Sequence, residues 1–214
     1  MNTTTHPTKI KVIQYMYGDF EYYPWSKKIN RHYCERHGYE YGVSHQAPRV
    51  ERYASWQKIP TILSELQNCD YLLLMDADAH FYSHELTVEQ ELIPLMAGKP
   101  ILMAQDFGSE QERWTPGKPN AGVILMKTDD QVRAFCEEWD KSPETDPSVC
   151  WNWPVDQLGL WNVVMPKFPD MVQVHPEYYM IQGRYGQYIR HYMLLSDKER
   201  TEQMRAFCER RNIE

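Results

Sequence analysis

An unbroken apolar run that ends in two aspartates constrains this chain more than any other feature. Residues 71–81 read YLLLMDADAHF, so four apolar side chains after Tyr71 lead directly into Asp76, and Asp78 follows two positions later. A continuous apolar run of this length is typical of a strand that is covered on both faces in a parallel sheet. The sequence therefore predicts an α/β fold with this strand at the centre of its sheet.

Strand-like and helix-like segments alternate on both sides of this run. Pro24 and Gly38 mark the two ends of the clearest helix, and Ser196 with Glu199 forms a capping box that opens the last one. Strands are expected at 9–15, 39–44, 71–75, 101–105 and 121–127, helices at 24–37, 55–68, 89–97, 129–139, 154–164 and 195–211, a polar loop at 107–119, and a loop with short strands at 176–192. The alternation predicts a mostly parallel, Rossmann-like central sheet with helices on both faces.

Length and composition fit one globular domain over residues 1–214, with residues 1–8 as a flexible polar tail. No segment approaches the roughly 20 apolar residues that a membrane span needs, and the polar start is no secretory signal. The five cysteines lack metal-ligand spacing, so we expect free thiols and a cytoplasmic location. The net charge of -7 argues against a nucleic-acid partner.

The two aspartates predict a site for a divalent metal ion. Side chains two apart in an extended chain point the same way, so Asp76 and Asp78 should converge beyond the carboxyl end of the strand, where open α/β sheets bind ligands. Two anions about 4 to 5 Å apart repel by roughly 3 to 4 kcal/mol at an effective dielectric constant near 20, unless a cation lies between them. Oxygen ligands favour Mg²⁺ or Mn²⁺, which leave positions open for phosphates, and the small Ala77 would let a diphosphate approach the backbone.

Two other interpretations of the aspartates stay open on these residues alone. The pair could cap a strand-to-helix turn in solvent. Aspartate-nucleophile phosphatases also place D-x-D after an apolar strand, and the acidic stretch 128–130 after the strand 121–127 echoes their second acidic pair. Against this, two strands precede the motif here, and His80 stands where those enzymes prefer Thr or Val. A phosphatase is therefore the less favoured alternative.

Six short motifs follow one another in a fixed order along residues 9–193: SWQK at 55–58, MDADAHF at 75–81, AQD at 104–106, PNAGVILMK at 119–127, VDQ at 155–157 and GQYIRHYM at 186–193. In this order they resemble the metal-dependent GT-A glycosyltransferases, most closely the retaining family of fungal galactosyl- and mannosyltransferases and plant xyloglucan xylosyltransferases. The resemblance implies transfer of a hexosyl or deoxyhexosyl group from a UDP-sugar to a glycan or glycoprotein hydroxyl. A version without membrane anchor is similar to the enzymes of large algal viruses, which act on capsid glycans in the host cytoplasm.

The resemblance also implies roles for individual residues. Asp76 and Asp78 would bind Mn²⁺ or Mg²⁺ with His191 as the third ligand. Asp156 would orient sugar hydroxyls, and Gln157 would stabilise positive charge at the anomeric carbon. The residues expected to contact the donor are Gln14, Tyr15, Tyr17, Lys58, Asp76, Ala77, Asp106, Asn120, Ala121 and Gly122, of which Gln14, Tyr15 and Tyr17 would form the uracil and ribose pocket.

Each of these roles has a plainer alternative. Taken alone, His191 would be a hydrogen-bonded histidine, Lys58 a solvated helix lysine, and Asp156 a favoured residue at a helix start. Ala121 is itself a small departure, since the family more often has Thr or Ser there. A module that binds a nucleotide sugar or glycan without turnover would carry the same ligands and remains the rival from another class.

Overall fold

The computed structural model describes residues 7–45, 51–67, 69–106, 117–176, 181 and 183–214. A central sheet of six strands has the order β2-β1-β3-β6-β5-β7. Its strands are β1 (Ile10–Tyr15), β2 (Glu40–Ser44), β3 (Tyr71–Asp76), β5 (Ile101–Gln105), β6 (Pro119–Lys127) and β7 (Val172–His175). Two short strands, β4 (Ala79–Phe81) and β8 (Ile189–His191), pair with each other outside this sheet.

Strand β6 runs against the direction of the rest of the sheet. It is antiparallel to both β3 and β5, whereas β1 is parallel to β2 and β3, and β5 is parallel to β7. Met75 near the end of β3 pairs with Val123. Because β6 is reversed, its first residues lie at the edge where β1, β3 and β5 end. The sheet is mixed and mostly parallel, as predicted, and the reversal of β6 was not expected.

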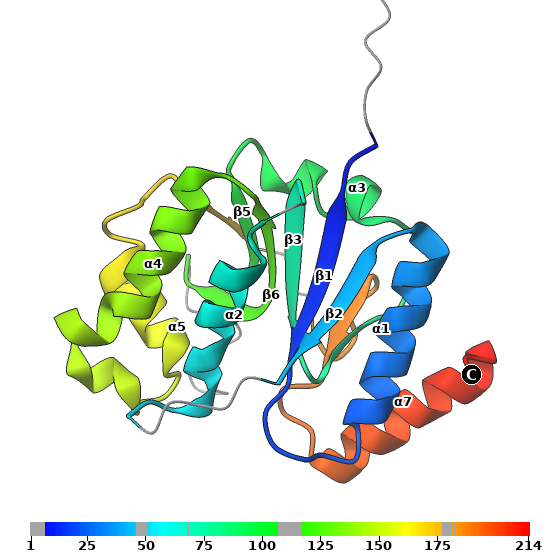
Figure 1. Cartoon of the computed structure of the whole chain (residues 1–214). Coiled ribbons are helices and arrows are strands. Elements are labelled where there is room, and N and C mark those ends of the chain that lie inside the picture. The colour runs from blue at the N-terminus through cyan, green and yellow to red at the C-terminus, as the bar shows by residue number, and fades with distance from the viewer. Residues whose placement is uncertain (1–6, 46–50, 68, 107–116, 177–180, 182) are drawn as a thin grey trace, which may run out of the picture.

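Helices cover both faces of the sheet (Figure 1). One face packs against α2 (Lys58–Glu65), α4 (Asp130–Thr145) and α5 (Asp156–Gly159), and the other against α1 (Tyr23–His37), α3 (Val88–Glu91) and the β4–β8 pair. Leu72 and Leu74 of β3 belong to the first core, Leu73 and Met75 to the second, and all four are 0 % exposed. Burial on both faces explains why this strand shows no polar alternation.

Several helices differ from the sequence prediction in extent. The expected helix 55–68 is a short 3₁₀ turn (Ala54–Gln57) followed by α2, and the expected helix 89–97 is only α3 and a 3₁₀ turn (Pro94–Met96). Pro94 explains the second break, because a proline cannot continue the helical hydrogen bonds. In contrast, α4 continues beyond 139 to Thr145, and α5 is followed by a π-helix (Leu160–Val164). Residues 1–6, 107–116, 177–180 and 182 of the expected tail and loops lie outside the described residues.

The last helix, α7 (Asp197–Arg211), packs against α1 (Figure 1). Both hydrogen bonds of the expected capping box between Ser196 and Glu199 are present. Asn212 closes the helix in the left-handed conformation, with a φ of 51°. None of the helices in the described part of the chain has the length and apolar character that a membrane crossing requires.

A buried histidine lies where α7, α1 and the segment after β4 meet. His84 is 2 % exposed, its Nδ1 lies 3.2 Å from Nδ1 of His32, and its ring packs on Phe207. Its Nε2 has no hydrogen-bond partner among the residues that the structure describes. Burial, and then the neighbouring His32 and Arg211, lower the pKa of His84 to about 4.

This histidine is expected to make the fold sensitive to mild acid. Between pH 6.5 and 4 the unfolded chain binds a proton at His84 that the folded chain does not, so the free energy of unfolding falls as the pH is lowered through this window. Urea titrations at pH 7 and 4.5 should show that His84→Gln loses less stability than the wild type, by on the order of 1 to 2 kcal/mol. Equal losses in the two proteins would contradict the assignment.

Candidate metal and active site

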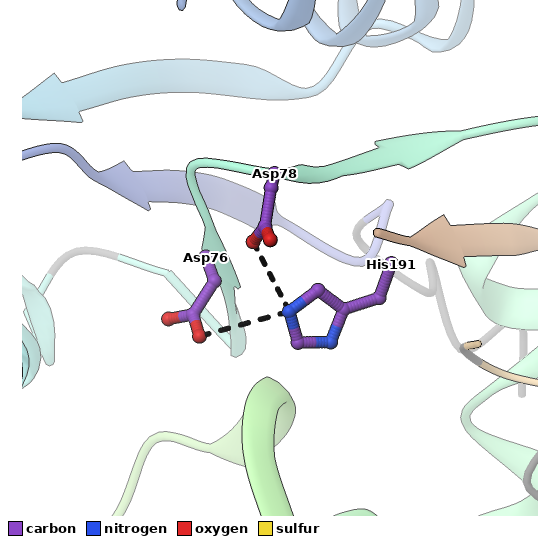
Figure 2. A group of neighbouring side chains, drawn as sticks. All are labelled: Asp76, Asp78 and His191. Atoms are coloured by element: carbon purple, nitrogen blue, oxygen red, sulfur yellow. Dashed lines mark ion pairs between the residues drawn. The ribbon is translucent and has the colours of Figure 1, made fainter. Parts of the chain in front are cut away.

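Three side chains that could bind one metal ion meet beyond the end of β3 (Figure 2). Asp76 is the last residue of β3, Asp78 follows in the turn to β4, and His191 ends β8. Nε2 of His191 lies 3.1 Å from Oδ1 of Asp78 and 3.8 Å from Oδ2 of Asp76. Potential ligand atoms of all three residues lie within 4.8 Å of one another.

The turn that carries the aspartates is held by buried polar side chains of β1 and α1. Gln14 is 0 % exposed, and its Nε2 donates to the backbone oxygens of Asp76, at 3.2 Å, and Ala79, at 3.1 Å. Nδ2 of Asn30 donates to the same Ala79 oxygen at 3.0 Å. Ala79 pairs with His191 in the β4–β8 ladder, so the same turn also fixes the histidine.

The three ligand candidates balance one another's charges. Burial alone raises the pKa of Asp78, but His191 and Arg200 outweigh it and hold this pKa below its ordinary value. Burial alone lowers the pKa of His191, and Asp78 and Asp76 raise it above its ordinary value. Burial raises the pKa of Asp76 despite Lys58 and His191. The two carboxylates therefore make the His191 imidazole hold its proton more tightly than in water, and the imidazole must be free of that proton before it can bind a metal.

The donor set fits a divalent ion such as Mn²⁺ or Mg²⁺. Two carboxylates and one imidazole are ligands that such ions accept. Neighbouring ligands of an octahedral ion bound at about 2.1 Å lie about 3 Å apart, and the separation between His191 and Asp78 is 3.1 Å. The geometry thus supports a metal site and does not select the ion.

Lys58 connects Asp76 to the predicted catalytic pair. It is 4 % exposed at the start of α2, so the solvated-lysine alternative is wrong. Its Nζ lies 2.9 Å from Oδ1 of Asp76 and 3.5 Å from Oδ2 of Asp156, and it donates to the backbone oxygen of Ala121 at 3.0 Å. Burial alone lowers the pKa of Lys58, but Asp156 and Asp76 raise it above its ordinary value, so the ammonium group stays charged.

The first residues of β6 form hydrogen bonds with one another and with other residues that are expected to contact the donor sugar. Asn120 Nδ2 donates to Oδ1 of Asp106 at 2.9 Å, and Asn120 Oδ1 accepts the Gly122 N–H at 2.9 Å. The Ala121 N–H donates to Oε1 of Gln157 at 2.7 Å. This bond fixes the amide oxygen that is expected to face the anomeric carbon, and it leaves that oxygen a second lone pair.

Asp156 follows a residue in an unusual backbone conformation. Val155 has a φ of 59°, which β-branched residues rarely adopt, and it is 3 % exposed. Such conformations persist where surrounding packing enforces them, and they are frequent at functional sites. Asp156 itself is 3 % exposed, and its Oδ2 has no hydrogen-bond partner among the described residues. Val155 thus turns a carboxylate inward, towards Lys58.

The residues expected around uracil and ribose have different surroundings. The Gln14 amide group is engaged in the turn described above and also accepts from Tyr41. Tyr15 is 6 % exposed and donates to the Ala54 backbone oxygen at 2.9 Å, whereas Tyr17 is 47 % exposed. Of the three, the exposed Tyr17 is best placed for a ligand, and the donor contacts of all three stay predictions.

Sequence reasoning missed two residues that organise this site. Asn30 holds the aspartate turn, and Arg200 of α7 lies 3.1 Å from Oδ2 of Asp78. Asn30 could have been found in the sequence, because it is a polar residue within the mostly apolar buried face of α1. We find no sequence signal for Arg200, which lies in a helix rich in charged residues.

Gly122 leaves the space that His191 occupies. A Cβ atom at this position would lie 2.0 Å from Cε1 and 2.6 Å from Nδ1 of the imidazole. No side chain fits there unless the histidine moves.

Gly122→Ala is therefore expected to displace His191 and to weaken Mn²⁺ binding by about 10-fold or more, with a stability loss of about 1 to 3 kcal/mol. Calorimetric titration with Mn²⁺ in the presence of UDP measures the binding. Gly38→Ala is the matched control, because this glycine has a φ of 72° and nothing near its Cβ position. The control should lose stability and keep its Mn²⁺ affinity, and unchanged affinity in Gly122→Ala would contradict the steric argument.

The second acidic pair that a phosphatase would need lies at the other edge of the sheet. The Thr128 N–H donates to the backbone oxygen of Asp70, just before β3 begins, because β6 is antiparallel. Asp129 caps α4 by accepting from the Val132 N–H at 2.9 Å. The acidic residues that resemble the second acidic pair of a phosphatase therefore lie at the start of α4, where Asp129 caps the helix.

Comparisons with known proteins find a matching family model and similar folds. Residues 12–114 match the model of the galactosyl transferase GMA12/MNN10 family. The fold is similar to that of a glycosyltransferase involved in the glycosylation of the major capsid of PBCV-1, with a TM-score of 0.73 and 16% identity over 92% of this chain and 99% of that chain. It is also similar to the glycosyltransferase GlyE of Streptococcus pneumoniae TIGR4, with a TM-score of 0.53 and 12% identity over 93% of this chain and 64% of that chain. A comparison with curated proteins gives no match.

The structural neighbours show the fold, and the family model covers β1 from Val12 onward, Lys58 and the two aspartates. Asn120, Asp156 and His191 lie beyond the matched residues, and the folded chain brings them to the same sheet edge. The match of residues 12–114 to the model of the galactosyl transferase GMA12/MNN10 family and the fold shared with two glycosyltransferases agree with the resemblance seen in the sequence.

Proposed function

We propose that this glycosyltransferase moves a hexosyl or deoxyhexosyl group from a UDP-sugar to a hydroxyl of a glycan or glycoprotein, with retention of configuration. The convergence of Asp76, Asp78 and His191 at the end of the central strand carries the proposal. Retention and the uridine nucleotide follow from the resemblance to the galactosyl-, mannosyl- and xylosyltransferases. The PBCV-1 neighbour is involved in capsid glycosylation, which supports a protein-bound glycan as the acceptor.

The metal site would act on the diphosphate of the donor. Asp76, Asp78 and His191 would hold Mn²⁺ or Mg²⁺, and a bound ion supplies Lewis-acid stabilisation of the departing UDP. Ala77 between the two aspartates is small and would leave room for the phosphates to approach the backbone of the turn.

The other side chains would bind and orient the transferred sugar. Asp106, Asn120 and Asp156 offer oxygens to its hydroxyls, and the Asn120–Asp106 and Lys58–Asp156 contacts fix their directions. Gln157 would place its amide oxygen against the positive charge that develops at the anomeric carbon as the bond to UDP breaks. The acceptor hydroxyl then forms the new bond on the same face, and its proton passes to a phosphate oxygen of UDP.

A donor panel tests this proposal. The protein is incubated with UDP-glucose, UDP-galactose, UDP-xylose, UDP-rhamnose and GDP-mannose with and without Mn²⁺, and thermal stability and UDP release are measured. A preferred donor should raise the melting temperature, because it binds the native state and not the unfolded chain. This rise should appear only when Mn²⁺ is present, because the proposed metal site binds the diphosphate of the donor through the ion. The preferred donor should also release UDP when an acceptor is supplied. Binding without any release would instead favour a module that holds nucleotide sugars, and indifference to Mn²⁺ would overturn the metal site.

A further inference from the structure

Arg200 of α7 contacts the metal site through several groups at once. Its Nη2 lies 3.1 Å from Oδ2 of Asp78. Its Nε donates to the backbone oxygen of Tyr192 at 3.0 Å, and Nη2 donates to that of Met193 at 3.2 Å. Tyr192 and Met193 directly follow His191, so one guanidinium group touches two of the three ligand-bearing segments.

The position of the guanidinium group is itself well fixed. Nη1 donates to Oδ1 of Asp197 at 3.0 Å, and the guanidinium carbon lies 5.3 Å from the centre of the Tyr22 ring. The Arg200 side chain is only 17 % exposed. A planar guanidinium with five N–H donors is suited to several acceptors in fixed directions, which a lysine ammonium is not.

The two carboxylate oxygens of Asp78 contact different partners. Oδ2 faces Arg200, and Oδ1 faces Nε2 of His191 at 3.1 Å. A carboxylate held at one oxygen cannot rotate freely, so the other oxygen keeps its direction towards the shared metal position. The Tyr192 N–H also donates to the backbone oxygen of Asp78 at 3.0 Å, which joins the two segments.

We propose that Arg200 is a positioning residue of the metal site, which holds the Asp78 carboxylate and the backbone after His191 so that both ligands face one ion. The inference rests on the proposed metal site, and it makes α7 a part of the active-site framework.

Whether removal of Arg200 weakens or strengthens Mn²⁺ binding shows whether this residue positions the ligands or acts only through its charge. Arg200 carries a positive charge beside a site for a divalent cation. If charge alone mattered, removing it would strengthen Mn²⁺ binding, because like charges repel. If Arg200 positions the ligands, removing it weakens Mn²⁺ binding instead. Partners that orient metal ligands commonly contribute 10- to 100-fold in affinity.

The test is a titration of the whole chain with Mn²⁺ in the presence of UDP, read by calorimetry and by the paramagnetic signal of free Mn²⁺. Arg200→Gln is expected to raise the Kd for Mn²⁺ by about 10- to 100-fold. Arg200→Lys should give a smaller rise, since it keeps the charge but donates from one nitrogen. Arg205→Gln is the matched control on the same helix, where Arg205 lies 3.9 Å from the exposed Glu209, and it should bind Mn²⁺ as the wild type does.

The outcomes are distinguishable. Unchanged or tighter binding in Arg200→Gln, with normal binding in the wild type, would overturn the role of Arg200 and leave the metal site standing. Absence of Mn²⁺ binding in the wild type would overturn both proposals. If Arg200→Gln fails to fold, Arg200→Lys decides, and a wild-type Kd in that variant would overturn the inference.

Discussion

Asp78→Asn is expected to lower sugar transfer by about 10³-fold, which corresponds to about 4 kcal/mol of transition-state stabilisation. The substitution removes the negative charge of a proposed metal ligand and keeps nearly the same shape. An amide oxygen can still accept the hydrogen bond from Arg200, so the surrounding fold should change little. The loss should therefore appear in turnover, measured as UDP release with the preferred donor, an acceptor and saturating Mn²⁺.

Asp70→Asn provides the control for this variant. Asp70 lies immediately before the other end of β3 and accepts the Lys9 N–H at 2.8 Å. The Asp70→Asn variant should retain the turnover of the wild type. If Asp78→Asn also transferred sugar at the wild-type rate with the wild-type dependence on Mn²⁺, the metal-binding role of this aspartate would be wrong.

Lys58→Met is expected to lower the free energy of unfolding by about 3 to 5 kcal/mol, because it leaves a buried carboxylate without its partner. Asp156 is 3 % exposed and Lys58 is the cation beside it, at 3.5 Å. Turnover should fall as well, since Asp76 and Asp156 lose the group that orients them. Urea titration measures the first effect, and the UDP release assay measures the second.

A second substitution separates the two effects of Lys58. The double variant Lys58→Met/Asp156→Asn removes the more deeply buried of the two carboxylates that Lys58 contacts, so part of the stability should return while turnover stays low. Lys198→Met is the surface control, because this side chain is 84 % exposed and pairs with Glu202 at 3.9 Å. It should change stability by less than about 0.5 kcal/mol. A Lys58→Met protein as stable as this control would contradict the buried ion pair.

Local patterns made the centre of the fold predictable. The apolar run of β3 could be recognised because both of its faces are buried, and the spacing of Asp76 and Asp78 on one side of an extended chain indicated a metal site. The order of the six motifs then supplied His191, Asp156 and Gln157. Turn and cap signals gave α7 its start, because a capping box is a local hydrogen-bond pattern.

What could not be predicted depends on contacts between distant segments. Nothing in an apolar strand such as β6 records its direction, although that direction brings Gly122 to the metal site and takes Asp129 away from it. The three-residue strands β4 and β8 are too short to show periodicity, and each exists through pairing with the other. The role of Arg200 could not be predicted either, because α7 contains many charged residues and only the folded chain brings this one to Asp78.

The β4–β8 pair has a consequence for the order of events during synthesis. It joins residues 79–81 to 189–191, so the proposed third ligand, His191, can reach the two aspartates only after the chain through β8 has left the ribosome. Contacts between such remote segments are costly in loop entropy and form late. A nascent or cleaved chain that ends before β8 would hold two acids and no imidazole, so binding of a metal by all three side chains would require that β4 and β8 have been translated and paired.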